Sequence, residues 1–425
     1  MGPTIILDKS SLQALSKKEL ILLNKLYLVN IPPVLTLEIL ADLKKTNDPS
    51  ALNEKTVIEI ANKLIQKDNA VNAHYLNLVI SSLMGVDYID SRKPHIGGAK
   101  KVKDKNGKVG FHIVETPEQI AIKNWQRGEF TEAEKVLATQ WRKYSKGIDL
   151  LELKKHWSSI KTIYPECKDF NNLLDISDFW LSNPSMQSQL LFAMLEELRL
   201  EQHLASSIFY RWESGEFNLL KDFAPYFNFV TKIDTAFRLG LVYDLITTRP
   251  TNRIDCEYLY YAPFCNVFSS RDNFHKSFAP LFLSDDQTFI DGDELKKDLK
   301  LIIEMLEKED SELNIDWNVQ FSLEPPNNED SLTYQMWKKY FPSWSPGWFY
   351  RKSDYPKNDK KVSQELNEKV NTLEELEFDP LEKFNDDEID FITIERQISL
   401  EDQCVCGSGN KFKDCCYKEG MKADA

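Results

Sequence analysis

Four acidic residues lie beside segments that could bring their carboxylates together. Asp8 follows the strand-like run TIIL, and Asp272 follows the apolar run FCNVF, so each comes soon after an expected strand. Glu38 lies on an expected helix, and Asp255 lies at an expected helix start. Open parallel sheets bind ligands outside the carboxyl ends of their strands. Because hard divalent cations prefer oxygen ligands, the four acids predict a Mg²⁺ or Mn²⁺ site.

The chemistry expected of such a site is hydrolysis of a phosphodiester. Clustered carboxylates repel one another, and a divalent cation relieves that repulsion. The bound cation can position and acidify a water and stabilise the leaving oxygen. We expect Asp8 and Asp272 to bind the metal directly, with Glu38 and Asp255 completing the set directly or through water. The alternative is that these acids have only local structural roles: Asp8 could cap the helix after it, and Asp272 could be a turn residue.

Three smaller polar side chains accompany the acids. Ser10 and Ser270 are interpreted as residues that orient waters or a substrate phosphate. His275 follows Asp272 closely and is interpreted as a surface or capping residue, with phosphate binding as the alternative.

The elements that must position these residues alternate between strand and helix. Strands are expected at 4–7, 27–31 and 288–290, and the stretch 254–275 reads as a short helix, a buried strand and a turn. A helix is expected from Ser10 through Leu23, and others begin near Thr36 and at Glu294. This alternation favours a parallel α/β sheet flanked by helices.

The four acids and their contexts resemble the acidic quartet of PIN-domain ribonucleases. ILDKSS resembles the first strand of that family with its Asp and nearby Ser, and TLEIL resembles its helical acid. Asp255 precedes Asp272 by 272 − 255 = 17 positions, and Ser270-Arg271-Asp272 resembles the family's S-x-D. The resemblance covers roughly residues 4–46 and 250–305. It implies a PIN-like sheet and a metal-dependent endoribonuclease, while the long span between Glu38 and Asp255 departs from a compact PIN domain.

The chain is expected to contain a split α/β domain and several additions. The PIN-like part takes 1–50 and 247–310. A mainly helical insertion takes 51–246, followed by an aromatic extension at 311–355, an acidic linker at 356–402 and a zinc motif at 403–418. The aromatic extension carries YFPSWSPGWFYRK, which is interpreted as core packing, with stacking on bases as the alternative.

Four of the seven cysteines lie in the tail, in the run CVCGSGNKFKDCC. Soft thiolates at this spacing suit tetrahedral zinc, and four of them leave no open position, so the site is expected to be structural. The run resembles the SEC-C motif, with Val405 where that motif has Pro. The resemblance implies a zinc-binding module that contacts a protein partner, and a bacterial origin. The expected ligands are Cys404, Cys406, Cys415 and Cys416.

Charge is segregated along the chain. The net charge is −14, but residues 364–402 hold 14 acidic and 3 basic residues, which leaves 53 − 50 = 3 net negative charges elsewhere. Residues 92–108 hold seven basic residues and one Asp. Asn106-Gly107 predicts a hairpin at 96–114. Four of its lysines are the expected contacts to RNA phosphate, with a merely solvated surface as the alternative: Lys101, Lys103, Lys105 and Lys108.

Composition is that of a folded protein, with 42% hydrophobic and 12% aromatic residues. No run is long and apolar enough to span a membrane, and no signal peptide is recognised, so the expected compartment is the cytoplasm. The expected function is a Mg²⁺- or Mn²⁺-dependent endoribonuclease, with a toxin or phage-defence role on family analogy alone. Two alternatives stay open: an inactive PIN scaffold that binds partners through its insertion and zinc tail, and a DNA-directed nuclease.

Overall fold

The structure is a computed structural model, and several of the expected features lie outside the part of the chain that it describes. Those features are Lys105, Lys108, most of the acidic linker and the four tail cysteines. The described residues are 2–46, 51–64, 70–86, 92–97, 99–103, 107, 109–113, 115–215, 217, 219–313, 324–346 and 374–375.

A five-stranded parallel sheet forms the centre of the fold, in the order β3-β2-β1-β6-β7. Its central strands are buried along their whole length, as expected where helices cover both faces of a parallel sheet. The prediction of a parallel α/β sheet is confirmed. The strands are β1 (Thr4–Leu7), β2 (Leu28–Ile31), β3 (Ala70–Val71), β6 (Val267–Ser270) and β7 (Thr288–Asp291).

Two boundaries differ from the prediction near the amino terminus. The single helix expected from Ser10 is two helices, α1 (Lys9–Ala14) and α2 (Lys17–Leu26). Ser16 and Glu19 form a capping box that starts the second helix afresh. The next helix, α3 (Pro33–Ala41), begins before Thr36 because proline is well suited to the first helical position.

The stretch that carries Asp255 and Asp272 has the expected helix–strand–turn form, with one correction. It consists of α14 (Thr251–Leu259), β6 and α15 (Asn273–Phe278). Asp255 lies in the middle of α14 and not at its start, because the helix begins at Thr251. After β7, α16 (Gly292–Leu313) packs against α1 and α2.

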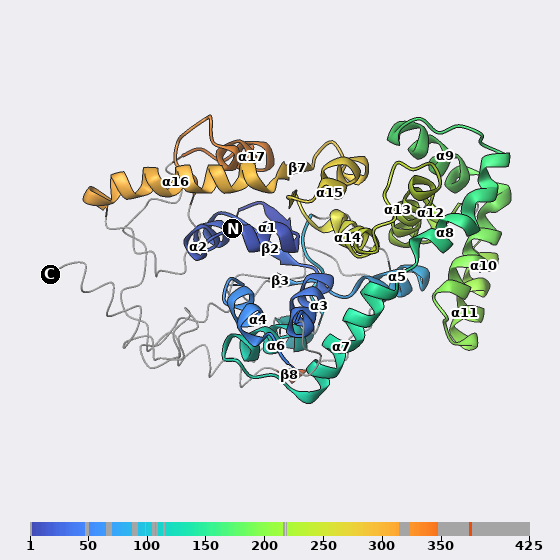
Figure 1. Cartoon of the computed structure of the whole chain (residues 1–425), viewed down its shortest axis with the longest axis horizontal. Coiled ribbons are helices and arrows are strands. Elements are labelled where there is room, and N and C mark those ends of the chain that lie inside the picture. The colour runs from blue at the N-terminus through green and yellow to red at the C-terminus, as the bar shows by residue number, and fades with distance from the viewer. Residues whose placement is uncertain are drawn as a thin grey trace.

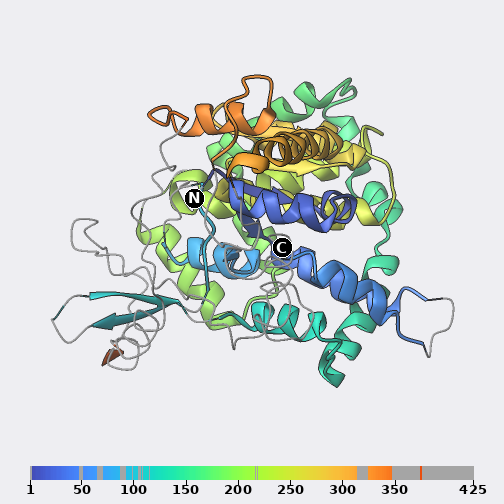
Figure 2. The same ribbon diagram turned by 90° about the vertical axis from the view of Figure 1, so that its left-hand side faces the viewer.

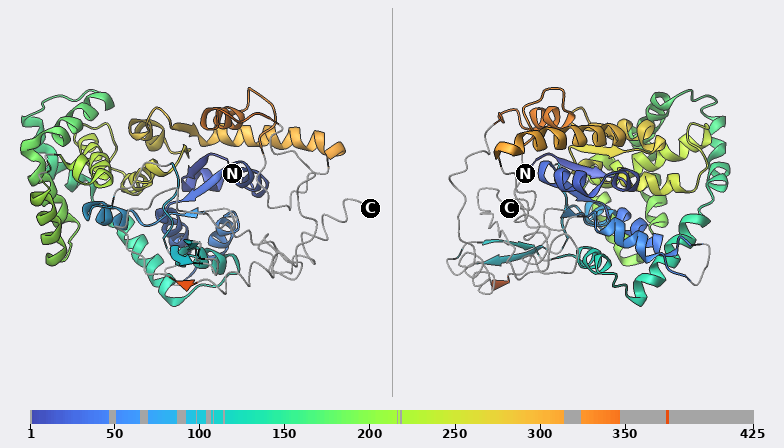
Figure 3. Two further views of the ribbon diagram at one scale, coloured as in Figure 1. Left: turned by 180° about the vertical axis from the view of Figure 1, so that it is seen from behind. Right: turned by 60° about the vertical axis from the view of Figure 1, so that its left-hand side comes forward.

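The span expected to be a helical insertion is helical but also contributes β3 to the sheet, pairing with β2. Its longest helix, α13 (Pro225–Val242), is almost wholly buried. Figure 1 shows α8 to α11 gathered at the end of the molecule opposite α16, and the view from behind in Figure 3 agrees. The other helices are α4 (Glu54–Ala61), α5 (Tyr75–Leu83), α6 (Pro117–Gln126), α7 (Glu132–Gly147), α8 (Leu150–Trp157), α9 (Phe170–Ser182), α10 (Gln187–Glu197), α11 (Gln202–Ser214) and α12 (Leu220–Phe223).

One apolar core joins the sheet to the insertion. It runs without a break from Ile5 and Val267 in the strands to Phe237 on α13 and Leu173 on α9. The insertion is therefore packed against the sheet domain and shares its core.

The predicted hairpin is present as β4 (Ala99–Lys103) and β5 (Val109–Ile113), paired antiparallel. A short strand from the acidic linker, β8 (Glu374–Glu375), pairs with the other edge of β4. Figure 2 shows this small sheet projecting from the body of the molecule. Lys103 is opposite Glu374 in the register, so basic and acidic segments far apart in sequence meet here.

Aromatic residues after α16 pack into the structure. Trp337, on α17 (Leu332–Tyr340), is 1% exposed, and Trp344 is 3% exposed against it. Within the described residues, the aromatic extension therefore supplies packing, as interpreted from the sequence.

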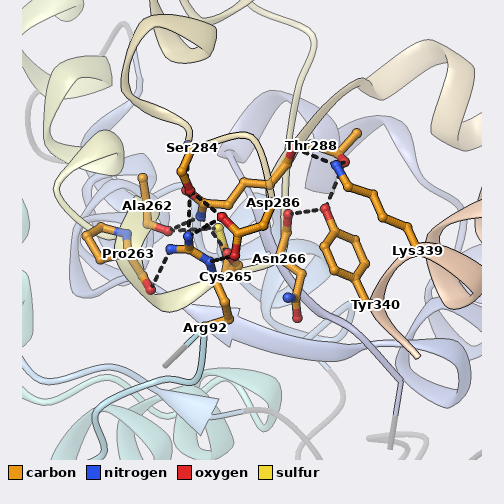
Figure 4. A network of polar contacts seen from close by, with 11 residues as sticks. Arg92, Ala262, Pro263, Cys265, Asn266, Ser284, Asp286, Thr288, Lys339 and Tyr340 are labelled. Carbon is orange, nitrogen blue, oxygen red and sulfur yellow. Dashed lines mark hydrogen bonds and ion pairs between the residues drawn. The ribbon is translucent and has the colours of Figure 1, made fainter. Parts of the chain in front are cut away.

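Polar contacts fasten the amino-terminal edge of the sheet (Figure 4). Arg92 donates to both carboxylate oxygens of Asp286, at 2.6 and 3.1 Å, and also contacts Ser284 and the carbonyl of Pro263. Lys339 donates to Thr288 Oγ1 at 3.0 Å. These contacts tie the insertion and α17 to the starts of β6 and β7.

Within the described residues, no helix has the length and apolar character needed to cross a membrane.

Candidate functional site

The parallel register of β1 and β6 brings Asp8 beside Ser270. Leu7 pairs with Ser269, so the residues that follow meet at the carboxyl edge of the sheet. Asp8 is 4% exposed and caps α1, with Oδ1 accepting from the Ser11 amide at 2.8 Å. Its Oδ2 accepts from Ser10 Oγ at 2.7 Å and from Ser270 Oγ at 2.8 Å. The capping role and the candidate site role of Asp8 therefore coincide.

His275 is fully buried behind this pair, and this corrects its interpretation as a surface residue. Its Nε2 lies 2.7 Å from the backbone carbonyl oxygen of Asp255, so Nε2 carries a proton and donates it. Its Nδ1 lies 2.9 Å from Ser270 Oγ and 3.6 Å from Asp8 Oδ2. The imidazole thus joins β6, α14 and the capping aspartate of α1.

The protons in this cluster can be assigned from hydrogen bonding and charge. Burial alone would lower the pKa of His275, but the hydrogen bond and charge of Asp8 raise it to about 9. At neutral pH, Nδ1 therefore donates to Ser270 Oγ, which leaves the Ser270 hydroxyl proton for Asp8. Burial would raise the pKa of Asp8, but His275 and Ser10 hold it below its usual range. Asp8 is an ionised, fully bonded carboxylate.

Asp255, unlike Asp8, lacks hydrogen bonds to one oxygen and has a raised pKa. Its Oδ2 is buried and has no hydrogen-bond partner. Burial raises the pKa of Asp255 to about 7, and the charges of Glu38 and Asp272 act in the same direction, while His275 and Arg249 oppose them. A buried carboxylate oxygen without a donor is costly. A carboxylate oxygen is also the donor type that a hard cation prefers.

Glu38 projects from α3 into the same neighbourhood. Its Oε2 accepts from Tyr258 on α14 at 2.6 Å. Burial raises the pKa of Glu38, while Lys9 and the Tyr258 hydrogen bond oppose that rise. Lys9 donates to the carbonyl of Glu38 and pairs with Asp42 at 2.8 Å. Asp42, one turn after Glu38, is thereby neutralised and is not available as a metal ligand.

Asp272 caps α15 at the mouth of the cluster, with Oδ1 accepting from the Phe274 amide at 2.8 Å. Its Oδ2 lies 3.7 Å from Arg249 Nη1. The backbone amide of Asp272 donates to Ser270 Oγ at 3.0 Å. The alternative for Asp272 is a turn residue, and its local role in the structure is instead that of a helix cap.

The four predicted acids share one region, but they do not form a ready ligand cage. The charge of Asp8 raises the pKa of Glu38, and the charges of Glu38 and Asp272 raise the pKa of Asp255. Within the described part of the chain, no three His, Cys, Asp or Glu side chains are arranged to hold a metal ion. The chemistry of the donors fits a hard cation, and among the oxygens of these four acids Asp255 Oδ2 is buried without a hydrogen-bond partner.

The predicted substrate residues divide into two groups. Ser270 is fully buried, and its hydroxyl bonds Asp8, His275 and the Asp272 amide, so it positions the acids and does not contact a substrate. Ser10 is partly exposed and accepts from the Arg271 amide. Lys101 and Lys103 lie on β4, in the small sheet that Figure 2 shows projecting from the body of the molecule.

Sequence reasoning missed Tyr258 and Arg249 and misread His275. The distance between α14 and α15 in the chain hides the contact of His275 with the Asp255 carbonyl. The signal for Tyr258 is its spacing of three residues from Asp255, which places both on one side of a helix.

Comparison with known proteins gives one match. Residues 402–418 match the family model of the SEC-C motif. No curated protein and no solved structure matches the chain significantly. The carboxyl-terminal segment therefore carries a SEC-C motif, as the run CVCGSGNKFKDCC predicts.

Proposed function

We propose that the chain is a metal-dependent endoribonuclease of the PIN type, acting at the carboxyl edge of its parallel sheet. The observation that carries this proposal is Asp255 Oδ2, a buried carboxylate oxygen without a donor among three other acids. Paired groups whose environments push their pKa values apart are typical of catalytic sites. Here Asp8 is held ionised and Asp255 is not. The PIN resemblance of ILDKSS and of Ser270-Arg271-Asp272 supports the same reading.

Asp255 is the expected centre of metal binding, with Asp8, Asp272 and Glu38 as the other candidate ligands. A bound Mg²⁺ or Mn²⁺ supplies charge neutralisation and an acidified water for attack on a phosphodiester. Ser270 and His275 hold Asp8 in its ionised form. Burial raises the pKa of Glu38 and its carboxylate accepts from Tyr258, so Glu38 is a further candidate for exchanging a proton with a water.

A second function has its own supporting observation. Among the residues that the structure describes, no three acids are arranged as a ready ligand set, and Arg249 lies 3.7 Å from Asp272. In an inactive scaffold that binds partners through its insertion and its tail, the acids would never bind a metal ion and Arg249 would stay beside Asp272. A DNA-directed nuclease would have the same site as a ribonuclease, so the substrate must be tested directly.

The tail is proposed to bind one structural zinc through Cys404, Cys406, Cys415 and Cys416. The SEC-C match at 402–418 and the soft, closed ligand set support this. Thiolates in zinc sites suit a reducing compartment, which supports the cytoplasm as the place of action. We propose that the module recruits a protein partner.

The test is incubation of the purified chain with single- and double-stranded RNA and DNA, in Mn²⁺ and in EDTA. Cleavage of RNA in Mn²⁺ that is absent in EDTA and in Asp8→Asn protein supports the ribonuclease. Cleavage of DNA alone would favour the DNA-directed enzyme. No cleavage of any substrate would favour the scaffold.

A further inference from the structure

Arg249 lies at the mouth of the acid cluster. Its Nη1 is 3.7 Å from Asp272 Oδ2, and its charge also acts on Asp255. Its side chain is 58% exposed, whereas that of Asp272 is 20% exposed. The guanidinium therefore lies where solvent, and a substrate from solvent, meets the carboxylates.

The backbone around Arg249 is fixed although its side chain is exposed. The Arg249 carbonyl accepts from the Asn252 amide at 3.0 Å. The Asn252 side chain donates to the carbonyl and to the hydroxyl of Thr247, both at 2.9 Å. This loop holds the Cα of Arg249 in place before α14, so the guanidinium has a defined starting point.

Three other cations at the carboxyl ends of the strands, among the described residues, are each paired with an acid. Lys9 is paired with Asp42 at 2.8 Å, Arg271 with Asp293 at 2.8 Å, and Lys276 with Asp291 at 2.5 Å. The contact of Arg249 with Asp272 is longer than a hydrogen bond. Among these four cations, Arg249 is the one whose donors remain open to a new anion.

Carboxylates repel a polyanion, and a positive charge beside them reduces that repulsion. Guanidinium groups present several donors in a planar fork that matches phosphate oxygens. We propose that Arg249 binds a backbone phosphate of the nucleic-acid substrate at the mouth of the site and exchanges its contact with Asp272 for that phosphate. This rests on the proposed nuclease function, and it assigns Arg249 as the residue that places the substrate.

The test measures binding separately from cleavage. Labelled single-stranded RNA is titrated against Asp8→Asn protein with and without Arg249→Ala, over a series of KCl concentrations. Loss of one phosphate contact should weaken binding about tenfold and reduce the salt slope by about one. In the active chain, Arg249→Ala should raise KM about tenfold and change kcat less, and Arg249→Lys should recover part of the loss.

The matched control is Arg127→Ala, which removes an arginine that is 37% exposed and paired with Glu129 at the end of α6. If Arg249→Ala binds RNA with the same affinity and salt slope as Arg127→Ala, the assignment of Arg249 is wrong. The proposed nuclease function is not contradicted by that result. If Arg249→Ala instead increases cleavage, the arginine blocks the acids and the assignment is also wrong. If the unsubstituted chain neither binds nor cleaves nucleic acid, both the function and this inference fail.

Discussion

Charged residues at the two ends of the strands of the central sheet have opposite surroundings. At the amino-terminal edge, Arg92 meets Asp286 through two hydrogen bonds, and the pKa of Asp286 falls to about 2 because of the Arg92 and Ser284 hydrogen bonds. At the carboxyl edge, Asp255 has a buried oxygen without a donor and a pKa raised to about 7. The same sheet thus carries a satisfied polar network at one end and an unsatisfied one at the other.

On the proposed function, this difference distinguishes charged groups that stabilise the fold from charged groups that bind a metal ion. A network that fastens loops gains most when each donor has an acceptor, as in Figure 4. A site that must accept a cation keeps an oxygen free and tolerates the cost in stability. Removing charge from the amino-terminal edge should therefore affect folding, and removing charge from the carboxyl edge should affect chemistry.

The largest expected effect is that of Asp8→Asn on cleavage. Asn lacks the negative charge that a metal ion requires, so metal-dependent cleavage of RNA should fall below detection, a loss on the order of a thousandfold or more. The measurement is cleavage of RNA in Mn²⁺ by purified protein with an unchanged circular dichroism spectrum. Asp286→Asn is the control from the other edge and should cleave normally. Full cleavage by Asp8→Asn would remove the acid cluster from the mechanism.

The same substitution should lower stability. Asp8 accepts hydrogen bonds from Ser10, Ser11 and Ser270 and offsets the charge of His275. Relief of repulsion between acids does not compensate for this loss, because both oxygens of the Asp8 carboxylate accept hydrogen bonds. We expect a decrease of about 1–3 kcal/mol in the free energy of unfolding.

Asp255→Asn should raise stability in metal-free buffer. The folded-state pKa of Asp255 is about 7, above its ordinary value of 3.8, so between these pH values the folded state holds a proton that the unfolded state has released. Stability is therefore lost as pH rises between these values, and Asn removes the loss. The gain should be absent near pH 4 and reach about 2–4 kcal/mol at pH 8. Urea unfolding at both pH values measures it, and an equal effect at both would contradict the raised pKa.

Asp272→Asn tests whether Asp272 binds the metal ion or only repels the charge of Asp255. It removes one of the charges that raise the pKa of Asp255, but Asp272 also caps α15. Asn can cap a helix almost as well as Asp, so the fold should be kept while metal-dependent cleavage is abolished. Cleavage assays and thermal unfolding together test this. Retained cleavage would exclude Asp272 as a ligand.

The sequence predicts the parallel sheet and the positions of its acids because both depend on local patterns. TIIL and FCNVF are apolar runs, and Asp8 and Asp272 follow them at strand ends. It does not predict that His275 is buried against the Asp255 carbonyl, because that contact depends on how α14 packs on α15. Nor does it predict β3, whose two residues have no periodicity and pair only because β2 offers an edge.

A moderate effect is expected at the amino-terminal edge from Arg92→Lys. Lysine keeps the charge but cannot reproduce the two-point contact with Asp286. Unfolding free energy should decrease by about 1–2 kcal/mol, while kcat for RNA cleavage should stay within about twofold. Urea unfolding and cleavage kinetics on the same preparation measure the two. A large loss of cleavage with normal stability would mean that this edge communicates with the acids.

A smaller effect is expected from the hairpin. Replacing Lys101, Lys103, Lys105 and Lys108 by Ala should weaken RNA binding and flatten its salt dependence, because fewer counterions are released. The strand β8 pairs along β4, with Glu374 and Glu375 in register with Lys103 and Val102. Anisotropy titrations over a salt series measure the slope. An unchanged slope would show that the hairpin is not part of the RNA surface.

The smallest effect on cleavage is expected from the tail. Its thirteen residues from Cys404 to Cys416 (416 − 404 + 1) contain only Val405 and Phe412 as large apolar side chains. A segment with so few apolar residues needs a bound metal ion or a cross-link to fold. Zinc binding in such peptides supplies folding free energy on the order of 10 kcal/mol. Elemental analysis should find one zinc per chain that survives gel filtration in Mg²⁺ and is lost in Cys406→Ser. That variant should cleave a short RNA normally and lose partner recruitment or activity in cells. Equal zinc in both proteins would refute the site, whereas lost cleavage would show that the tail contacts the nuclease edge.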